Sequence, residues 1–300
     1  MDILVTGSSG FIGRNICETF SDKHNLLTPT HRELDLLDEN AVRIYIKNNN
    51  PDIILHCANR GGERNTLHLP DAVGYNTRIF FNLIRNSHLV KKIIYFGTGA
   101  EYGKHKDIIN VREEEFDVCV PKDDYGFYKY TFTKFIERYD NIINLRLFGI
   151  FGKYENYDYK FISNAIIRNM LGLEMNLGQN LVTDYIYIND LMSVLDFFIK
   201  KTPKSKVYNV TSGVHISLLD ICSIISKISA KPSKTNVLKP GLNYEYTADN
   251  SRLVKELDGY KFTAYEIAIR DLFYYYKQNI DKLDKDKCAV NAYLSTYSTR

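Results

Sequence analysis

The chain has 300 residues, of which 44% are hydrophobic and 25% charged, as in soluble folded proteins, and this excludes a disordered or collagen-like chain. Its net charge of +3 is too small to indicate a nucleic-acid or membrane-surface protein. The five cysteines are dispersed without metal-ligand spacing, and no apolar run reaches the ~18 residues of a membrane span, so we expect a cytoplasmic protein without disulfides, metal or membrane contact.

Short apolar runs alternate with helical patterns through the first half of the chain. The expected strands are at 2–6, 25–28, 33–36, 53–56, 92–96 and 142–147. The expected helices are at 11–20, 38–49 (with Asp38 as N-cap), 75–88 and 125–140. This alternation predicts βαβ units and a doubly wound α/β fold, because right-handed crossovers place helices on both faces of a parallel sheet.

The pattern becomes mixed after Phe151. Helices are expected at 159–171, 190–200, 217–229, 251–257 and 263–277, and strands at 183–188, 206–210, 235–239 and 244–247. We expect residues 1–150 plus about 184–212 to form the doubly wound domain, and about 151–183 and 213–280 to form a smaller mixed α/β domain that binds substrate. Residues 281–300 are expected to be a polar, solvated tail, and 113–115 an exposed loop face.

A glycine loop, TGSSGFIG at residues 6–13, follows the first expected strand and opens the first helix. Its first glycine allows a tight turn, the second lets the backbone approach a pyrophosphate, and the third lets helix and strand pack closely. The helix N-terminus adds unpaired N–H groups and the positive end of its dipole. We therefore predict a dinucleotide site over a glycine turn without ligand. Its expected cofactor-binding residues are Gly7, Ser9, Gly10, Phe11, Ile12 and Gly13.

The residues after the second strand bear on the choice of dinucleotide. An NAD site usually has an acid roughly 20 residues after the glycine loop, to bind the ribose 2′-hydroxyl. Here Thr28, Pro29 and Thr30 stand at that place, followed by His31 and Arg32. The nearby guanidinium favours the 2′-phosphate of NADP(H). The alternative is NAD(H), with Arg32 an ordinary surface arginine.

A threonine, a tyrosine and a lysine are spaced for proton-transfer chemistry. Thr98 follows an apolar strand, at the edge where parallel sheets bind ligands. Tyr125 and Lys129 are four residues apart and share a helix face, where the ammonium is expected to lower the phenol pKa. The phenol can then exchange a proton with a sugar hydroxyl or ketone, while Thr98 holds the same oxygen.

The same spacing recurs by chance elsewhere in a chain with 23 tyrosines. Tyr102 and Lys106 begin on a glycine-flanked turn, so a helical register is not expected there. Tyr130 and Lys134 share the Tyr125 helix, but five residues rotate them about 140° away. The order glycine loop, Thr98, Tyr125 favours the Tyr125 pair.

These motifs carry a family resemblance. TGSSGFIG, DLL at 35–37, HCA at 56–58, Asn76, GTGAEYG, YGFYK, RLFGIFG and TDYIYIND resemble the extended short-chain dehydrogenase/reductase family that acts on nucleotide sugars, over roughly residues 1–260. THRELDLLD followed by PDIILHCA is similar to its reductase branch, with GDP-fucose synthase and dTDP-4-dehydrorhamnose reductase. The resemblance implies a Rossmann-type domain and catalysis by Thr98, Tyr125 and Lys129. It also implies that Tyr125 and Lys129 contact the cofactor, with Lys129 holding the nicotinamide ribose. Further implied cofactor contacts are Asp35, Leu36, Cys57, Ala58 and Asn76.

The resemblance also implies substrate contacts and shows departures. The expected substrate-binding residues are Thr98, Gly99, Ala100, Arg168, Tyr185 and Arg252. Family dehydratases carry an acidic pair where this chain has Gly99 and Ala100, and we expect Glu101 to point away. The cysteine that GDP-fucose synthase uses for epimerisation is matched by Ala100. Gly149 and Phe151 replace the usual Asn and Tyr.

We therefore predict an NADPH-dependent reductase that transfers hydride to a ketone, at C4, of a keto-sugar nucleotide, with Tyr125 donating the proton. The alternatives are an NAD-dependent nucleotide-sugar 4-epimerase that uses the same triad and a non-catalytic NADP-binding sensor or scaffold. The resemblance further implies a homodimer formed through the helices at 75–88 and 125–140. The nucleotide base and the sugar stay open.

Overall fold

Six parallel strands form the main sheet of the computed structural model, which describes residues 1–62, 64–66, 69–290 and 292–295. Their order is β10-β6-β4-β3-β1-β2, and every neighbouring pair is parallel. The strands are β1 (Asp2–Thr6), β2 (Asn25–Leu27), β3 (Ile53–His56), β4 (Lys92–Thr98), β6 (Ile142–Leu147) and β10 (Val207–Val210). The order reverses between β1 and β3, where sheets of this kind bind ligands. The predicted doubly wound parallel sheet is confirmed.

Alternation along the strands gives the sheet one apolar core on each face. Ile3 and Val5 of β1 pack with α1 and α6, whereas Leu4 between them packs with α2, α3 and α4. These helices are α1 (Phe11–Phe20), α2 (Glu39–Asn49), α3 (Ala72–Ile84), α4 (Asp124–Ile136) and α6 (Ile188–Lys200). Asp38 caps α2 as predicted, since its carboxylate accepts hydrogen bonds from the N–H groups of Asn40 and Ala41.

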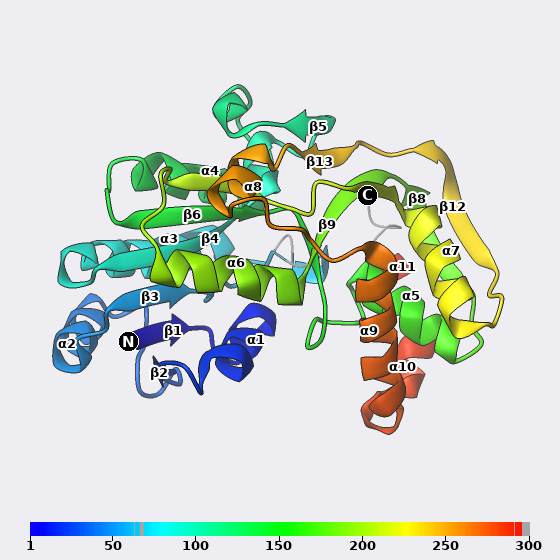
Figure 1. Cartoon of the computed structure of the whole chain (residues 1–300), viewed down its shortest axis with the longest axis horizontal. Helices are drawn as coiled ribbons and strands as arrows, with labels where there is room; N and C mark the ends of the chain where they lie inside the picture. The colour runs from blue at the N-terminus through cyan, green and yellow to red at the C-terminus, as the bar shows by residue number, and fades with distance from the viewer. Residues whose placement is uncertain (63, 67–68, 291, 296–300) are drawn as a thin grey trace.

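A second lobe is formed by α5, β8, α7, β12 and α9, which lie together beside the main sheet (Figure 1). Its elements are α5 (Phe161–Met170), β8 (Met175–Asn180), α7 (Leu218–Ser229), β12 (Thr235–Leu242) and α9 (Tyr265–Gln278). A second sheet, β11-β9-β13-β5 with β7 paired to β9, runs between this lobe and the main sheet. Its strands are β5 (Ile108–Val111), β7 (Gly149–Phe151), β9 (Val182–Tyr187), β11 (His215–Ser217) and β13 (Tyr246–Ala248), and α8 (Ser251–Glu256) follows β13.

Three sequence expectations differ from the structure. Residues 33–36 form turns instead of a strand, because the Glu33 carboxylate binds the N–H and hydroxyl of Thr30 and the Asp35 carboxylate binds the N–H of Leu37. Residues 281–290 and 292–295 are no solvated tail: α10 (Lys285–Val290) and α11 (Ala292–Ser295) pack on the second lobe and bury Cys288 and Tyr293. The rest of the expected tail lies outside the described residues. Glu113 is buried in a 3₁₀ turn, η4 (Glu113–Glu115), and its carboxylate accepts the N–H of Asn209 at 2.7 Å.

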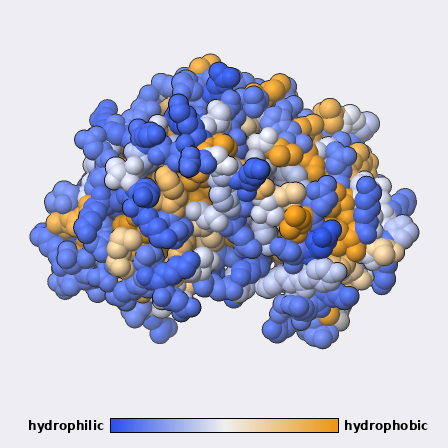
Figure 2. All heavy atoms as spheres, in the orientation of Figure 1, coloured by the Kyte–Doolittle hydropathy of each residue, from blue (hydrophilic) through white to orange (hydrophobic). Residues whose placement is uncertain are grey.

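The surface in view is largely hydrophilic, and apolar side chains gather on it over the lobe that carries α7 and β12 (Figure 2). Leu238 and Leu242 of β12 are among the exposed apolar residues. Of the helices within the described ranges, none is long and apolar enough to cross a bilayer.

Candidate functional site

The glycine loop lies at the switch point between β1 and β3. Gly7 has a φ of +70°, and a Cβ added there would lie 2.7 Å from the backbone nitrogen of Ala58, just after β3. A Cβ on Gly13 would lie 2.2 Å from the Gly7 carbonyl oxygen. Gly10 precedes α1 and offers no side chain to cap it, which leaves the first N–H groups of the helix for another acceptor. This arrangement fits a dinucleotide pyrophosphate.

The end of β3 is shaped by buried polar contacts. His56 is 5% exposed and its Nδ1 lies 2.8 Å from the hydroxyl of Thr6, while burial lowers its pKa to about 3. His56 is therefore a neutral packed histidine. Burial also raises the pKa of the adjacent Cys57 thiol. Asn76 accepts the N–H of Arg60 and donates to its carbonyl at 2.8 Å, so it acts on the loop that follows β3.

The turn after β2 presents one basic and one acidic side chain, Arg32 and Asp35. Arg32 is exposed and makes no ion pair or hydrogen bond with any residue in the described part of the chain. The Asp35 side chain is 46% exposed and lies 3.7 Å from the Nδ1 of His31. Leu36 is half-buried against the core formed by α2, α3 and α4. The turn therefore presents an exposed guanidinium and a half-exposed carboxylate near each other in the sequence.

Thr98 and Tyr125 come together at the carboxyl end of β4. Thr98 ends the strand and caps a 3₁₀ turn, η3 (Gly99–Tyr102), with its hydroxyl oxygen 3.2 Å from the N–H of Ala100. Tyr125 is in the first turn of α4, and its ring lies against Gly62, where a Cβ would come within 2.5 Å. Burial raises the pKa of Tyr125 to about 12, against a smaller lowering by the Thr98 hydroxyl beside it.

Lys129 is buried on the same helix as Tyr125, and its contacts differ from one sequence expectation. Its ammonium donates to the carbonyl of Phe96 at 2.8 Å and lies 4.6 Å from the ring centre of Tyr95. Burial lowers the pKa of Lys129 to about 8. The expected lowering of the Tyr125 pKa by Lys129 is wrong, because burial dominates at the phenol and the ammonium is held by the Phe96 carbonyl. The phenol is therefore protonated at neutral pH.

A buried carboxylate ties Thr98 to the helix that carries Tyr125. Glu101 is fully buried and accepts hydrogen bonds from the Thr98 N–H at 2.9 Å and from the Thr133 hydroxyl of α4 at 2.8 Å. Arg146 of β6 completes the cluster, 2.6 Å from the same carboxylate. Glu101 thus points into the protein, as expected, and fixes Thr98 relative to α4. An acid in a 3₁₀ turn and an arginine on a later strand gave no spacing signal for this contact.

The two positions after Thr98 leave no room for a carboxylate. A Cβ on Gly99 would lie 2.6 Å from both the Phe148 ring and the hydroxyl of Tyr246. Ala100 is fully buried. Tyr246, on β13, was missed in the sequence, because an aromatic residue in a short strand-like piece far along the chain is indistinguishable there from a core residue.

Arg168 is not brought to this cluster. It is 6% exposed, and its guanidinium donates to the carbonyls of Glu174 at 2.7 Å and Cys288 at 2.8 Å. It therefore joins α5 to the loop before β8 and to α10. The prediction that Arg168 contacts substrate is corrected on this ground, since main-chain carbonyls already bind its donors.

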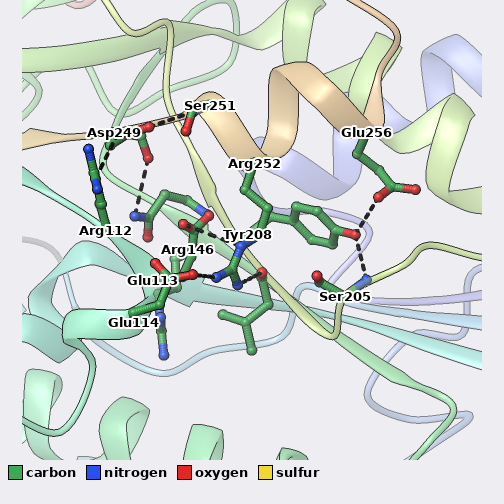
Figure 3. A network of polar contacts seen from close by, with 12 residues as sticks. Arg112, Glu113, Glu114, Arg146, Ser205, Tyr208, Asp249, Ser251, Arg252 and Glu256 are labelled. Atoms are coloured by element: carbon green, nitrogen blue, oxygen red, sulfur yellow. Dashed lines mark hydrogen bonds and ion pairs between the residues drawn. The ribbon is translucent and has the colours of Figure 1, made fainter.

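Arg252 is likewise engaged within the fold (Figure 3). Its guanidinium donates to the carbonyl of Val207 at 3.1 Å and pairs with the carboxylates of Glu113, at 3.6 Å, and Glu114. These contacts join α8 to β10 and η4. The predicted diphosphate contact of Arg252 is therefore corrected, because two carboxylates neutralise the charge that a diphosphate would require.

Tyr185 of β9 occupies space beside the main sheet. A Cβ on Gly149 would lie 2.3 Å from the Tyr185 ring. The ring therefore occupies the space that any side chain at position 149 would need. The backbone N–H and carbonyl of Tyr185 both bond to the hydroxyl of Tyr265, at 2.8 and 3.1 Å. The glycine that departs from the family pattern at 149 is thus matched by the tyrosine at 185.

Comparisons with known proteins agree with this geometry. The model of the NAD dependent epimerase/dehydratase family matches residues 3–211. GDP-L-colitose synthase of Yersinia pseudotuberculosis is 24% identical over 256 residues, covering 76% of this chain and 82% of that protein. Among solved structures, a GDP-mannoheptose C4 reductase from Campylobacter jejuni with NADP bound has a TM-score of 0.79 at 20% identity, covering 92% of this chain and 98% of that one.

UDP-glucose 4-epimerase from Thermotoga maritima has the same fold as this chain. Its TM-score is also 0.79, at 19% identity, with 93% of this chain and all of that one covered. The resemblance of the sequence motifs to the extended short-chain dehydrogenase/reductases is thereby confirmed. With the family model spanning more than half of its length, the chain belongs to the NAD-dependent epimerase/dehydratase family.

Proposed function

We propose that the chain is an NADPH-dependent reductase of a keto-sugar nucleotide, acting on a ketone at C4 in the synthesis of deoxysugar or surface-polysaccharide precursors. The observation that carries this proposal is the pairing of a protonated phenol, Tyr125, with the Thr98 hydroxyl at the end of β4. A bound nicotinamide cofactor supplies the hydride. Tyr125 donates the proton to the ketone oxygen, and Thr98 holds that oxygen in place.

The state of the phenol favours reduction over epimerisation. An epimerase must first oxidise an alcohol, for which Tyr125 would act as a base and lose its proton. Burial raises the pKa of Tyr125 and so keeps the phenol protonated, which is the state that a reductase needs at the start of its reaction, whereas an epimerase needs the deprotonated state first. Dehydration is opposed by geometry, since it requires an acid beside the threonine and the space at Gly99 is filled by Phe148 and Tyr246.

A substrate screen tests the proposed activity. The purified protein is incubated with NADPH and 4-keto-6-deoxyhexoses linked to GDP, UDP, dTDP or CDP, and NADPH oxidation is followed by absorbance. Cofactor deuterated at C4 is expected to transfer one deuterium to the product, detected by mass spectrometry. Tightly bound NAD together with interconversion of 4-epimeric nucleotide sugars, without NADPH consumption, would instead identify the epimerase.

Arg32 provides a test of the cofactor preference. Because its guanidinium is exposed and unpaired within the described residues, we propose that it binds the 2′-phosphate of NADP(H). Arg32→Ala is expected to weaken NADPH binding about tenfold or more and to leave NADH binding unchanged, as measured by fluorescence titration. Arg43→Ala, an exposed arginine on α2, is the control. Equal weakening for both cofactors would contradict this role.

We also propose a homodimer formed through α3 and α4. The two helices pack together, and a surface groove beside them is lined by Leu37, Gly74, Arg78 and Phe81. Phe127 on α4 is 47% exposed. A groove beside α3 and an exposed aromatic side chain on α4 support burial of these helices against a second copy.

A further inference from the structure

Tyr246 is held firmly at the meeting point of the two sheets. It begins β13, where it pairs in parallel with Ile108 of β5 and with Thr183 of β9. The next residue, Thr247, accepts the N–H of Asn110 at 2.8 Å. The position of the Tyr246 backbone is therefore fixed by strands on both sides, and its side chain reaches the end of β4 from a remote part of the chain.

The ring of Tyr246 is packed as firmly as its backbone. The ring centres of Tyr246 and Phe148 are 4.9 Å apart. The ammonium of Lys104 lies 4.1 Å from the ring centre of Tyr246. Aromatic packing of this kind restricts the ring to one orientation. The hydroxyl consequently has a defined place, 2.6 Å from where a Cβ on Gly99 would stand.

The hydroxyl of Tyr246 is buried and makes no regular hydrogen bond to the residues that the structure describes. The Thr98 hydroxyl lies close enough to oppose the rise in the Tyr246 pKa that burial causes. Buried hydroxyls in folded proteins nearly always have partners, because an unsatisfied one is destabilising. The phenol of Tyr246 is therefore a fixed hydroxyl beside Thr98 that makes no regular hydrogen bond to a described residue.

We propose that Tyr246 is a specificity-determining residue whose hydroxyl binds a hydroxyl of the sugar on a carbon next to the ketone. This role rests on the proposed reductase activity, in which Thr98 and Tyr125 hold the ketone oxygen. Since the Tyr246 hydroxyl lies against Gly99, the residue directly after Thr98, the sugar oxygen nearest to the ketone is the one that Tyr246 meets. A substrate without that hydroxyl leaves the buried phenol unpaired and is discriminated against.

The test compares two substrates and three proteins. The substrates are the best 4-keto-6-deoxyhexose nucleotide from the screen and its 3-deoxy analogue, and kcat and KM are measured for the wild type, Tyr246→Phe and Tyr244→Phe. Tyr244→Phe is the matched control, because Tyr244 lies two residues earlier and is 54% exposed. Tyr246→Phe removes only the oxygen and keeps the ring packed against Phe148.

We expect the wild type and Tyr244→Phe to prefer the hydroxylated substrate by about tenfold or more in kcat/KM, and Tyr246→Phe to lose that preference. The KM for NADPH is expected to stay unchanged in all three proteins. A preference retained in Tyr246→Phe, or an equal loss on both substrates, overturns the role of Tyr246 and leaves the reductase activity standing. A wild type that reduces no keto-sugar in the screen overturns the reductase activity itself.

Discussion

Tyr125→Phe is expected to lower kcat for ketone reduction by about 10²–10⁴-fold, the contribution that a positioned general acid makes. The substitution removes the proton donor and leaves the ring packed against Tyr128, with ring centres 5.6 Å apart. NADPH binding, measured by fluorescence titration, is therefore expected to stay at the wild-type level while turnover falls.

The chain contains a matched control for this substitution. Tyr130 is on the same helix and also stands four residues before a lysine, Lys134. Its hydroxyl bonds to Asp117 on the surface and is not directed to Thr98. Tyr130→Phe is expected to keep wild-type kcat. Undiminished turnover in Tyr125→Phe would refute the proton-donor role, and a wild type without any turnover would favour the sensor or scaffold.

Arg146→Met is expected to lower the free energy of unfolding by about 3–5 kcal/mol, because it leaves the carboxylate of Glu101 charged and buried without its partner. Arg146 is 1% exposed and Glu101 is fully buried. The Glu101 carboxylate also accepts hydrogen bonds from the Thr98 N–H and the Thr133 hydroxyl. Loss of the Arg146 guanidinium is therefore expected to disturb these two contacts as well. Denaturation with urea, followed by circular dichroism, measures the change.

Two further variants separate charge burial from simple loss of packing. The double variant Arg146→Met with Glu101→Gln removes the unpaired charge while the amide oxygen still accepts hydrogen bonds, so it is expected to be more stable than Arg146→Met alone. Arg112→Met breaks a surface pair in which Arg112 is 67% exposed and lies 3.2 Å from Asp249, and it is expected to cost less than about 1 kcal/mol. Similar losses for Arg146→Met and Arg112→Met would contradict a special role for the buried pair.

Local signals in the sequence sufficed for the main sheet. The first strand, the glycine loop and the helix after it are contiguous, so their residues interact over short distances. Asp38 is predictable as a cap because the N–H groups that donate to its carboxylate lie within three residues. The expected strand at 33–36 failed because side-chain contacts of Glu33 and Asp35 formed turns there. Such hydrogen bonds compete locally with strand pairing.

Contacts between residues that are far apart in the sequence could not be predicted from local sequence patterns. Glu101 and Arg146 are 45 residues apart, and Tyr246 reaches Thr98 only because β13 pairs with β5 and β9. Arg252 has the charge for a diphosphate, yet the fold surrounds it with Glu113 and Glu114. A residue's type shows what it is able to bind, whereas the topology decides which partner it meets.

The path of the chain has a mechanical consequence. After β6 the backbone leaves the main sheet for α5 and β8, returns through β9 and α6 to β10, and departs again to α7 and β12 before β13 brings it back. Neither lobe is a contiguous stretch, so a single proteolytic cut releases no intact half. Because several connections would have to bend together, swinging about one hinge is disfavoured, and unfolding in a single cooperative transition is favoured.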